Sequence, residues 1–234
     1  MRFLICAALF AASVSACGGR EDAGSTEQPT SPEVALAGGA PSPGPTLAVK
    51  PAPSDGPFGL SQGMTVAQIS ELTGKAPLEN DGSFYVLATV PKPHPAFEGY
   101  FATVSPKLGL CKIVGYVSVE SNRFGHQVKN QVDALKTPLT EKYGPPDRSI
   151  DSVLRGSLWD EPEDFMMGLI QKDRTLLYVW SSSERDSPLP NDLAAIGLRA
   201  VASRSDTADV SLGYEFSNFG DCVAESEAQS NDSL

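Results

Sequence analysis

The chain has 234 residues, and 41% of them are apolar, so it is long enough to bury the core of one ordinary domain. Its 29 acidic and 18 basic residues give a net charge of -11. That charge argues against binding to nucleic acid or, by charge alone, to anionic lipid, because both need a basic surface.

Residues 1–16 have the pattern of a secretory signal peptide, in which Arg2 precedes an apolar run from Phe3 to Ala12. That run is too short to span a bilayer. Residues 14–17, Val-Ser-Ala-Cys, resemble the bacterial lipobox, which implies cleavage before Cys17 and attachment of lipid to it. The alternative is a plain secreted protein. Because Gly18 and not Asp follows the cysteine, the resemblance implies the outer membrane, with the domain facing the periplasm.

Residues 17–56 are predicted to be the lipidated cysteine and a disordered tether. The stretch from Gly18 to Gly56 has seven prolines and no aromatic residue, so it cannot bury enough apolar surface to offset its ordering entropy. As a flexible coil it would reach roughly 35 Å. We expect a folded domain over 57–223 and a disordered acidic tail over 224–234.

Two helices are predicted in the domain. Thr65 and Gln68 fit a capping box for a helix over Val66–Thr73, and Gly74 fits its C-terminal cap. The second helix carries an apolar stripe with spacings of three and four residues. Pro138 lies inside this helix and is expected to kink or restart it, with Thr137 as the new cap. The stripe consists of Phe124, Val128, Val132, Leu135, Leu139 and Tyr143.

The remaining apolar runs are predicted to be strands, and the last two are expected to pair. Helices followed by sequential strands indicate an α+β fold with an antiparallel sheet and two main helices. Each half runs from a helix through a glycine-proline stop into hairpins. This order fits a tandem duplication, or a coincidence of common helix stops. The predicted strands are 84–90, 100–104, 110–120, 153–159, 165–171, 175–180, 194–203 and 210–216.

The first helix also carries a family resemblance. Residues 63–65, Gly-Met-Thr, followed by Gln68 and an apolar helix ending at Gly74, resemble the start of the BamE-type outer-membrane assembly lipoproteins. Those proteins share a helix-plus-sheet layer with the β-lactamase inhibitor proteins, which carry it twice. The domain as a whole is similar to a proteobacterial lipoprotein family without an assigned function.

Cys111 and Cys222 are the two cysteines that remain in the predicted domain. In the oxidising periplasm we expect them to form a structural disulfide, and the alternative is two buried thiols. The chain has no C-x-x-C motif, so redox catalysis is not expected.

The polar candidates have ordinary alternatives. His94, in a proline-rich loop, would be a binding contact, a base or a plain surface residue, and His126 is expected in solvent. The acidic run 160–164 would hold Ca²⁺, form a carboxylate pair or be a solvated loop. Two isolated histidines do not make a zinc site, so we predict no metal, no cofactor and no catalytic residue.

Aromatic residues beside these loops would form a surface for a protein partner if they share one face, and otherwise they are ordinary core. The candidate surface comprises His94, Phe97, Tyr100, Trp159, Asp160 and Phe165, with Phe101 nearby.

No catalytic motif is present, so we expect a non-catalytic protein-interaction module in cell-envelope assembly or maintenance. The alternatives are a binder of small ligands or peptidoglycan and a hydrolase with an unrecognised site. An open sheet face would favour the first reading. A pocket lined by His94 or by residues 160–164 would favour the others.

Overall fold

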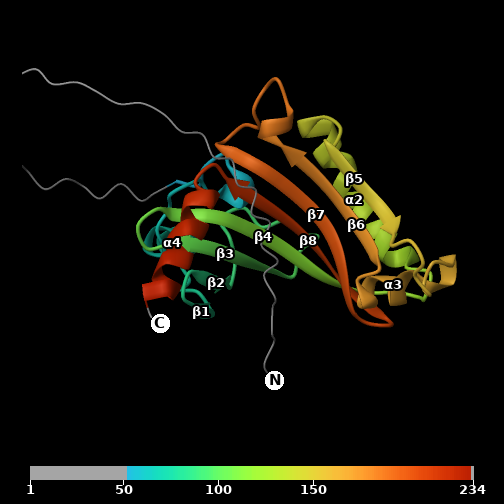
Figure 1. The fold of residues 1–234 in the computed structure, drawn as a ribbon. Helices are drawn as coiled ribbons and strands as arrows, with labels where there is room; N and C mark the ends of the chain where they lie inside the picture. The colour runs from blue at the N-terminus through green and yellow to red at the C-terminus, as the bar shows by residue number, and fades with distance from the viewer. Residues whose placement is uncertain (1–51, 233–234) are drawn as a thin grey trace, which may run out of the picture. The chain divides into compact units, whose positions relative to one another are not determined.

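A computed structural model describes residues 52–232. The signal peptide, Cys17 and the tether as far as residue 51 lie outside the described residues. The described part contains one antiparallel sheet of eight strands in the order β1-β2-β3-β4-β8-β7-β6-β5 (Figure 1). With the helices this makes the α+β fold that the sequence predicts.

The elements follow one another closely along the chain. The strands are β1 (Glu79–Asp81), β2 (Phe84–Leu87), β3 (Gly99–Ser105), β4 (Gly109–Glu120), β5 (Arg148–Val153), β6 (Arg174–Ser181), β7 (Leu193–Arg204) and β8 (Thr207–Phe216). The α-helices are α1 (Val66–Thr73), α2 (His126–Tyr143), α3 (Phe165–Gln171) and α4 (Phe219–Asp232), and short 3-10 turns lie at Pro57–Gly59, Pro162–Asp164 and Ser182–Glu184.

The strand order divides the domain into two halves with the same plan. In each half a helix precedes four strands that are neighbours in sequence and in the sheet, α1 with β1–β4 and α2 with β5–β8. The last strands of the halves, β4 and β8, pair with each other from Lys112–Glu215 to Glu120–Thr207. This is the arrangement expected of a tandem duplication, with α3 as an addition to the second half.

Helix α1 forms as predicted. The Thr65 hydroxyl accepts a hydrogen bond from the Gln68 amide at 3.3 Å, and the Gln68 side chain accepts one from the Thr65 amide at 2.8 Å. Gly74 ends the helix in the left-handed conformation at φ 68°, where glycine has no steric penalty. Ile69 is the buried residue of this helix.

Helix α2 runs unbroken through Pro138, so the restart predicted at Thr137 is wrong. The Thr137 hydroxyl instead donates to the Asp133 carbonyl oxygen at 3.0 Å, inside the helix. Leu135 and Leu139 lie on either side of the proline in sequence and are both buried in the core, which holds the two turns on one face. Tertiary packing thus outweighs the local cost of the proline.

Two of the predicted strands are wrong. Residues 165–171 form helix α3, because a short apolar run is compatible with either a strand or a buried helix. Residues 153–159 leave the sheet after Val153. The chain turns there, since the Ser157 amide donates to the Leu154 carbonyl oxygen at 3.1 Å.

The predicted ends of the domain also need correction. Helix α4 continues to Asp232, so residues 224–232 are helical and not a disordered tail. At the other end, the predicted tether runs to Gly56, yet the Ser54 amide already donates to the Gly59 carbonyl oxygen at 3.0 Å. The folded part therefore begins before Pro57.

The two faces of the sheet are covered differently. On β3, Tyr100, Ala102 and Val104 are buried and belong to the same core as the apolar residues of α2 and α3. The alternate side chains of each strand point to the opposite face. We call this opposite side the open face. Figure 1 shows α4 lying across β3 and β4. Helix α4 contacts Ser105 and Lys112. The side chains of these two residues point to the open face, because they alternate with the buried residues of their strands. Helix α4 therefore covers one end of the open face.

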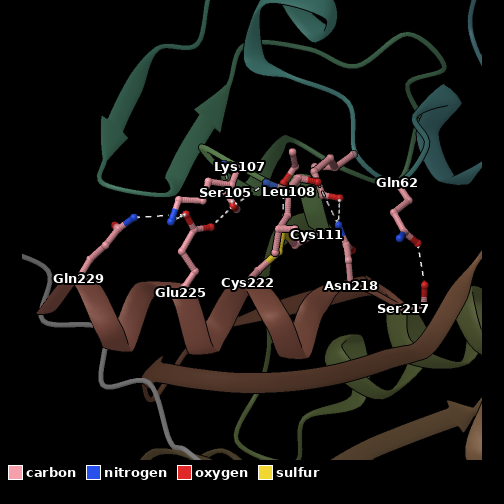
Figure 2. The surroundings of a disulfide bond; sticks show 12 residues. Gln62, Ser105, Lys107, Leu108, Cys111, Ser217, Asn218, Cys222, Glu225 and Gln229 are labelled. Atoms are coloured by element: carbon pink, nitrogen blue, oxygen red, sulfur yellow. Dashed lines mark hydrogen bonds and ion pairs between the residues drawn. A yellow bond between two sulfur atoms is a disulfide. The ribbon is translucent and has the colours of Figure 1, made fainter. Parts of the chain in front are cut away.

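A disulfide joins Cys111 of β4 to Cys222 of α4, with 6.5 Å between their Cα atoms, as the sequence predicts. Figure 2 shows that Cys222, Glu225 and Gln229 lie along one side of α4, and that Asn218 points the same way at the start of the helix. The Asn218 amide donates to the carbonyl oxygens of Leu108 and Leu110, both at 3.2 Å. The helix is thus attached to the start of β4 by a covalent bond and by hydrogen bonds beside it.

Candidate interaction surface

Three of the predicted surface residues lie together in an aromatic cluster on the helix-covered side. The ring of Phe58 lies 5.6 Å from Phe97, 5.0 Å from Tyr100 and 5.5 Å from Tyr214, each edge to face. The His94 amide donates to the Tyr100 hydroxyl at 2.9 Å. This geometry is favourable for aromatic rings and connects the proline loop to the sheet.

The cluster is part of the core. Tyr100 is only 4% exposed and Tyr214 is 8% exposed. Burial raises the pKa of Tyr214. It also raises the pKa of Tyr100, although the hydrogen bond with the His94 backbone acts in the opposite direction. Both phenols therefore stay neutral. Gly115 leaves room for the cluster, because a Cβ there would lie 2.9 Å from the Phe97 ring. The prediction that Tyr100 is exposed for a partner is wrong, and its ordinary alternative, core, is correct.

The other three predicted residues lie around α3. Phe165 is fully buried, with the Lys129 ammonium 4.1 Å and the Arg174 guanidinium 5.1 Å from its ring centroid. Trp159 is half-buried and Asp160 is exposed. Phe165 therefore cannot belong to a partner surface. No ring contact or hydrogen bond within residues 52–232 joins this group to the aromatic cluster.

The two histidines have local contacts. The His94 Nδ1 atom accepts from the Ala96 amide at 3.2 Å and its ring lies 5.5 Å from Phe97. The His126 ring stacks on Phe124 at 5.5 Å. In the described part of the chain, no group of three or more His, Cys, Asp or Glu side chains is placed to hold a metal ion.

A different surface emerges on the open face, where a row of apolar or absent side chains crosses six strands. The strand register places each member of the row directly opposite the next. We call it the central row, and it consists of Val86, Phe101, Val114, Gly213, Gly197 and Val179. All six are half-buried, so none is fully covered by α4 or by a loop.

Aromatic rings lie at the first-half end of this row. Phe101 stacks on Tyr116 with 4.5 Å between centroids and 9° between planes, and Phe84 lies 5.2 Å from Phe101. Cross-strand aromatic pairs stabilise a sheet and here also give the open face a flat apolar surface.

Two glycines face each other in the middle of the row. Gly213 of β8 is paired with Gly197 of β7. A Cβ on Gly197 would meet no atom within 4 Å, and one on Gly213 would make only ordinary contacts from 3.5 Å outward. Neither has a positive φ. Neither packing nor backbone conformation therefore requires glycine at these sites. Glycine in a strand interior costs about 0.5–1 kcal/mol and is found where another backbone approaches closely.

Polar groups beside the row are paired with one another. The Lys112 ammonium lies 2.7 Å from the Glu215 carboxylate, and the Arg199 Nε donates to the Ser211 hydroxyl at 3.4 Å. The Lys112–Glu215 pair is neutral, whereas Arg199 is exposed and keeps its positive charge at the border of the row, so the row itself is suited to an apolar contact.

Two surface pockets in the described part of the chain contain neither His94 nor residues 160–164. One lies between Lys107 and α4. The other lies where β6 and β7 meet the loop between them, and Ser181, Ala195 and Ser217 are among its lining residues.

Sequence reasoning missed the open face, although its signal is present. The alternation in 210–216 predicts a half-buried strand, and glycines stand at outward positions of that strand and of 194–203, at Gly213 and Gly197.

Comparisons with known proteins add no relative. No protein-family model, curated protein or solved structure matches this chain. No helix within residues 52–232 has the length and apolar character needed to cross a membrane.

Proposed function

We propose that this protein is a lipoprotein, anchored through Cys17 to the outer membrane and facing the periplasm, that acts as a non-catalytic protein-interaction module in the cell envelope. The signal-peptide pattern and the lipobox support the location. The disulfide between Cys111 and Cys222 supports an oxidising compartment.

The central row on the open face carries the proposal. It offers an apolar surface across six strands, with bare backbone at Gly197 and Gly213 in its middle. A partner side chain or strand can approach closest where no Cβ intervenes. Because the row is apolar and the neighbouring charges of Lys112 and Glu215 are paired, the partner is a protein segment with aliphatic or aromatic side chains against the row, and Arg199 lies at the border of this contact.

The test combines capture with matched glycine substitutions. The full chain is captured with its partners from cross-linked envelope, beside a Cys17→Ala control, and the affinity for the captured protein is then measured. Gly197→Leu fills the open space over the row. Gly220→Leu in α4 is the control, since a Cβ there also meets nothing within 4 Å.

We expect Gly197→Leu to weaken binding by tenfold or more, roughly the loss of one central contact, and Gly220→Leu to leave it unchanged. Tyr116→Ala, which removes the stacked ring beside Phe101, should act in the same direction. Equal affinity for wild type, Gly197→Leu and Tyr116→Ala would exclude the open face as the contact surface.

The pocket beside Ser181, Ala195 and Ser217 favours a second candidate, the binding of a small ligand or a peptidoglycan fragment. Such sites combine apolar walls with a few polar groups, and this one includes Leu189 and Asn191. A thermal-shift screen with soluble peptidoglycan fragments tests it, with Ser182→Trp to block the pocket. A shift seen in wild type and lost in the variant would support this candidate.

A further inference from the structure

A second surface, away from the central row, is the loop over residues 154–159 between β5 and α3. Leu158 is 86% exposed and Leu154 is 62% exposed. Trp159 beside them is half-buried. Two large aliphatic side chains this exposed within five residues form an apolar tip, whereas single exposed apolar residues need no explanation.

Hydrogen bonds hold the loop in one conformation. The Leu154 amide donates to the Asp173 carbonyl oxygen at 2.7 Å, and the Ser157 hydroxyl donates to the Asp173 carboxylate at 2.7 Å. The Trp159 amide in turn donates to the Ser157 hydroxyl at 2.9 Å. Gly156 permits the turn with φ +84°. An apolar tip that is ordered before it meets a partner loses little entropy on binding.

Acidic residues follow the tip directly. Asp160 and Glu161 are exposed, Glu163 is half-buried, and within residues 52–232 no ion pair holds any of them. The neighbouring Asp164 is different, since its carboxylate lies 3.7 Å from the Arg123 guanidinium. The tip therefore has an acidic rim with free charge on the α3 side, and Arg155 supplies the single cation within the loop.

We propose that the 154–159 loop is a docking element that inserts Leu154 and Leu158 into an apolar pocket of a protein partner, and that lysine or arginine side chains border this pocket. The charge of the rim selects the occupant, because a basic border complements Asp160, Glu161 and Glu163. An anionic lipid surface is disfavoured by the same acidic rim and by the net charge of -11.

The experiment uses the full chain with a photo-reactive amino acid, benzoylphenylalanine, in place of Leu154. The matched control carries it in place of Leu78, which is 67% exposed in the first half. Cross-linking in the intact envelope is followed by mass spectrometry of the joined peptide. We expect one protein adduct from position 154 and none of that protein from position 78. The joined peptide should lie beside lysine or arginine.

Two variants then test the recognition itself. In the position-154 background, Leu158→Ser and the double change Asp160→Lys with Glu161→Lys, both at exposed positions, should each lower the adduct yield by about tenfold or more. Leu78→Ser should leave the yield unchanged. All three changes lie on the surface, so urea unfolding should show the wild-type stability, which separates lost docking from lost folding.

Several outcomes would overturn the inference: an adduct with lipid or with a second copy of this chain, no adduct, or a yield that ignores the charge reversal. Gly197→Leu serves in the same assay to keep this surface distinct from the central row. Loss of the adduct in Leu158→Ser but not in Gly197→Leu identifies the loop as the contact independently of the open face.

Discussion

The two halves of the sheet share one strand plan but are stabilised differently. In the first half, α1 has eight residues and buries only Ile69. In the second half, α2 has 18 residues and buries five side chains, and α3 adds further buried residues. The first half instead has α4, joined to it by the disulfide on the other face of the sheet. Among the helices of residues 52–232, none covers the open face of the second half in this way.

This difference shows that the same order of one helix and four strands can be stabilised in two ways. Where the helix on the core side buries little, a second helix and a covalent bond supply the missing stabilisation. Where the core-side helices bury more, the opposite face stays free for contacts. Helix α4 therefore covers one end of the open face at Ser105 and Lys112, while the six residues of the central row stay only half-buried.

Removing the disulfide should have the largest effect and should fall on the first half. A closed loop spanning 111 residues contributes about 4–5 kcal/mol in the chain-entropy model. We expect Cys111→Ser with Cys222→Ser to lower the free energy of unfolding by about that amount in urea titrations. Reductant should bring the wild type to the same value and leave the double variant unchanged. A wild type indifferent to reductant would contradict this account.

Phe165→Ala should be the largest single-residue effect in the second half. The Phe165 ring is fully buried between α2 and β6, in contact with Lys129 and Arg174. Truncating a buried phenylalanine costs about 3–5 kcal/mol. Urea unfolding would measure this, with Phe124→Ala as a control because Phe124 is 37% exposed. Similar losses in the two variants would mean that α3 is not held by this ring.

Asp147→Asn tests the end of α2, where Asp147 accepts from Arg185 at 2.7 Å and from the Ser181 amide at 2.8 Å. Burial opposes ionisation of this carboxyl, but these hydrogen bonds outweigh it and lower its pKa. The stabilisation is therefore present at neutral pH and is lost as pH falls through the lowered pKa. We expect the variant to be less stable by about 1.5–3 kcal/mol at pH 7.

The pH dependence gives the decisive comparison for this pair. Urea titrations at pH 7 and near pH 3 should show the gap between wild type and Asp147→Asn shrinking at the lower pH, below the ordinary aspartate pKa of about 3.9. A constant gap would show that the ion pair with Arg185 is not its source.

Thr65→Ala should have the smallest effect. It removes the hydroxyl that accepts from the Gln68 amide at the start of α1. Loss of such a cap costs about 1 kcal/mol. Thr65→Ser keeps the hydroxyl and should restore most of the difference in urea unfolding. If Thr65→Ala left the free energy of unfolding unchanged, α1 would contribute even less to the stability of the first half than its single buried residue suggests.

The local signals in the sequence were sufficient for some elements and not for others. The capping box at Thr65 and Gln68 and the stripe through α2 are short-range patterns, and both helices form where they predict. The run 165–171 is too short to reveal a period, and its helix depends on packing against Arg123 and α2, far away in sequence. The acidic composition of 224–232 hides a helix that depends on contacts with β3 and β4.

The candidate surfaces show the same limit. The sequence marked Trp159 and Asp160 beside the exposed loop but not Leu154 and Leu158, because exposure of a leucine is set by what packs over it. Pairing of Gly197 with Gly213 could not be read from either strand alone, since it depends on the register between them. The disulfide was predictable because the predicted domain contains only two cysteines and its expected compartment, the periplasm, is oxidising.

The position of Cys222 has a consequence for the timing of maturation. Cys222 follows Cys111 by 111 residues, and at synthesis rates of about 5–20 residues per second it is made on the order of 10 s later. During that interval Cys111 is a free thiol on a first half whose last helix does not yet exist. A chain cut short before Cys222 keeps that thiol permanently, so thiol labelling distinguishes truncated molecules from complete ones.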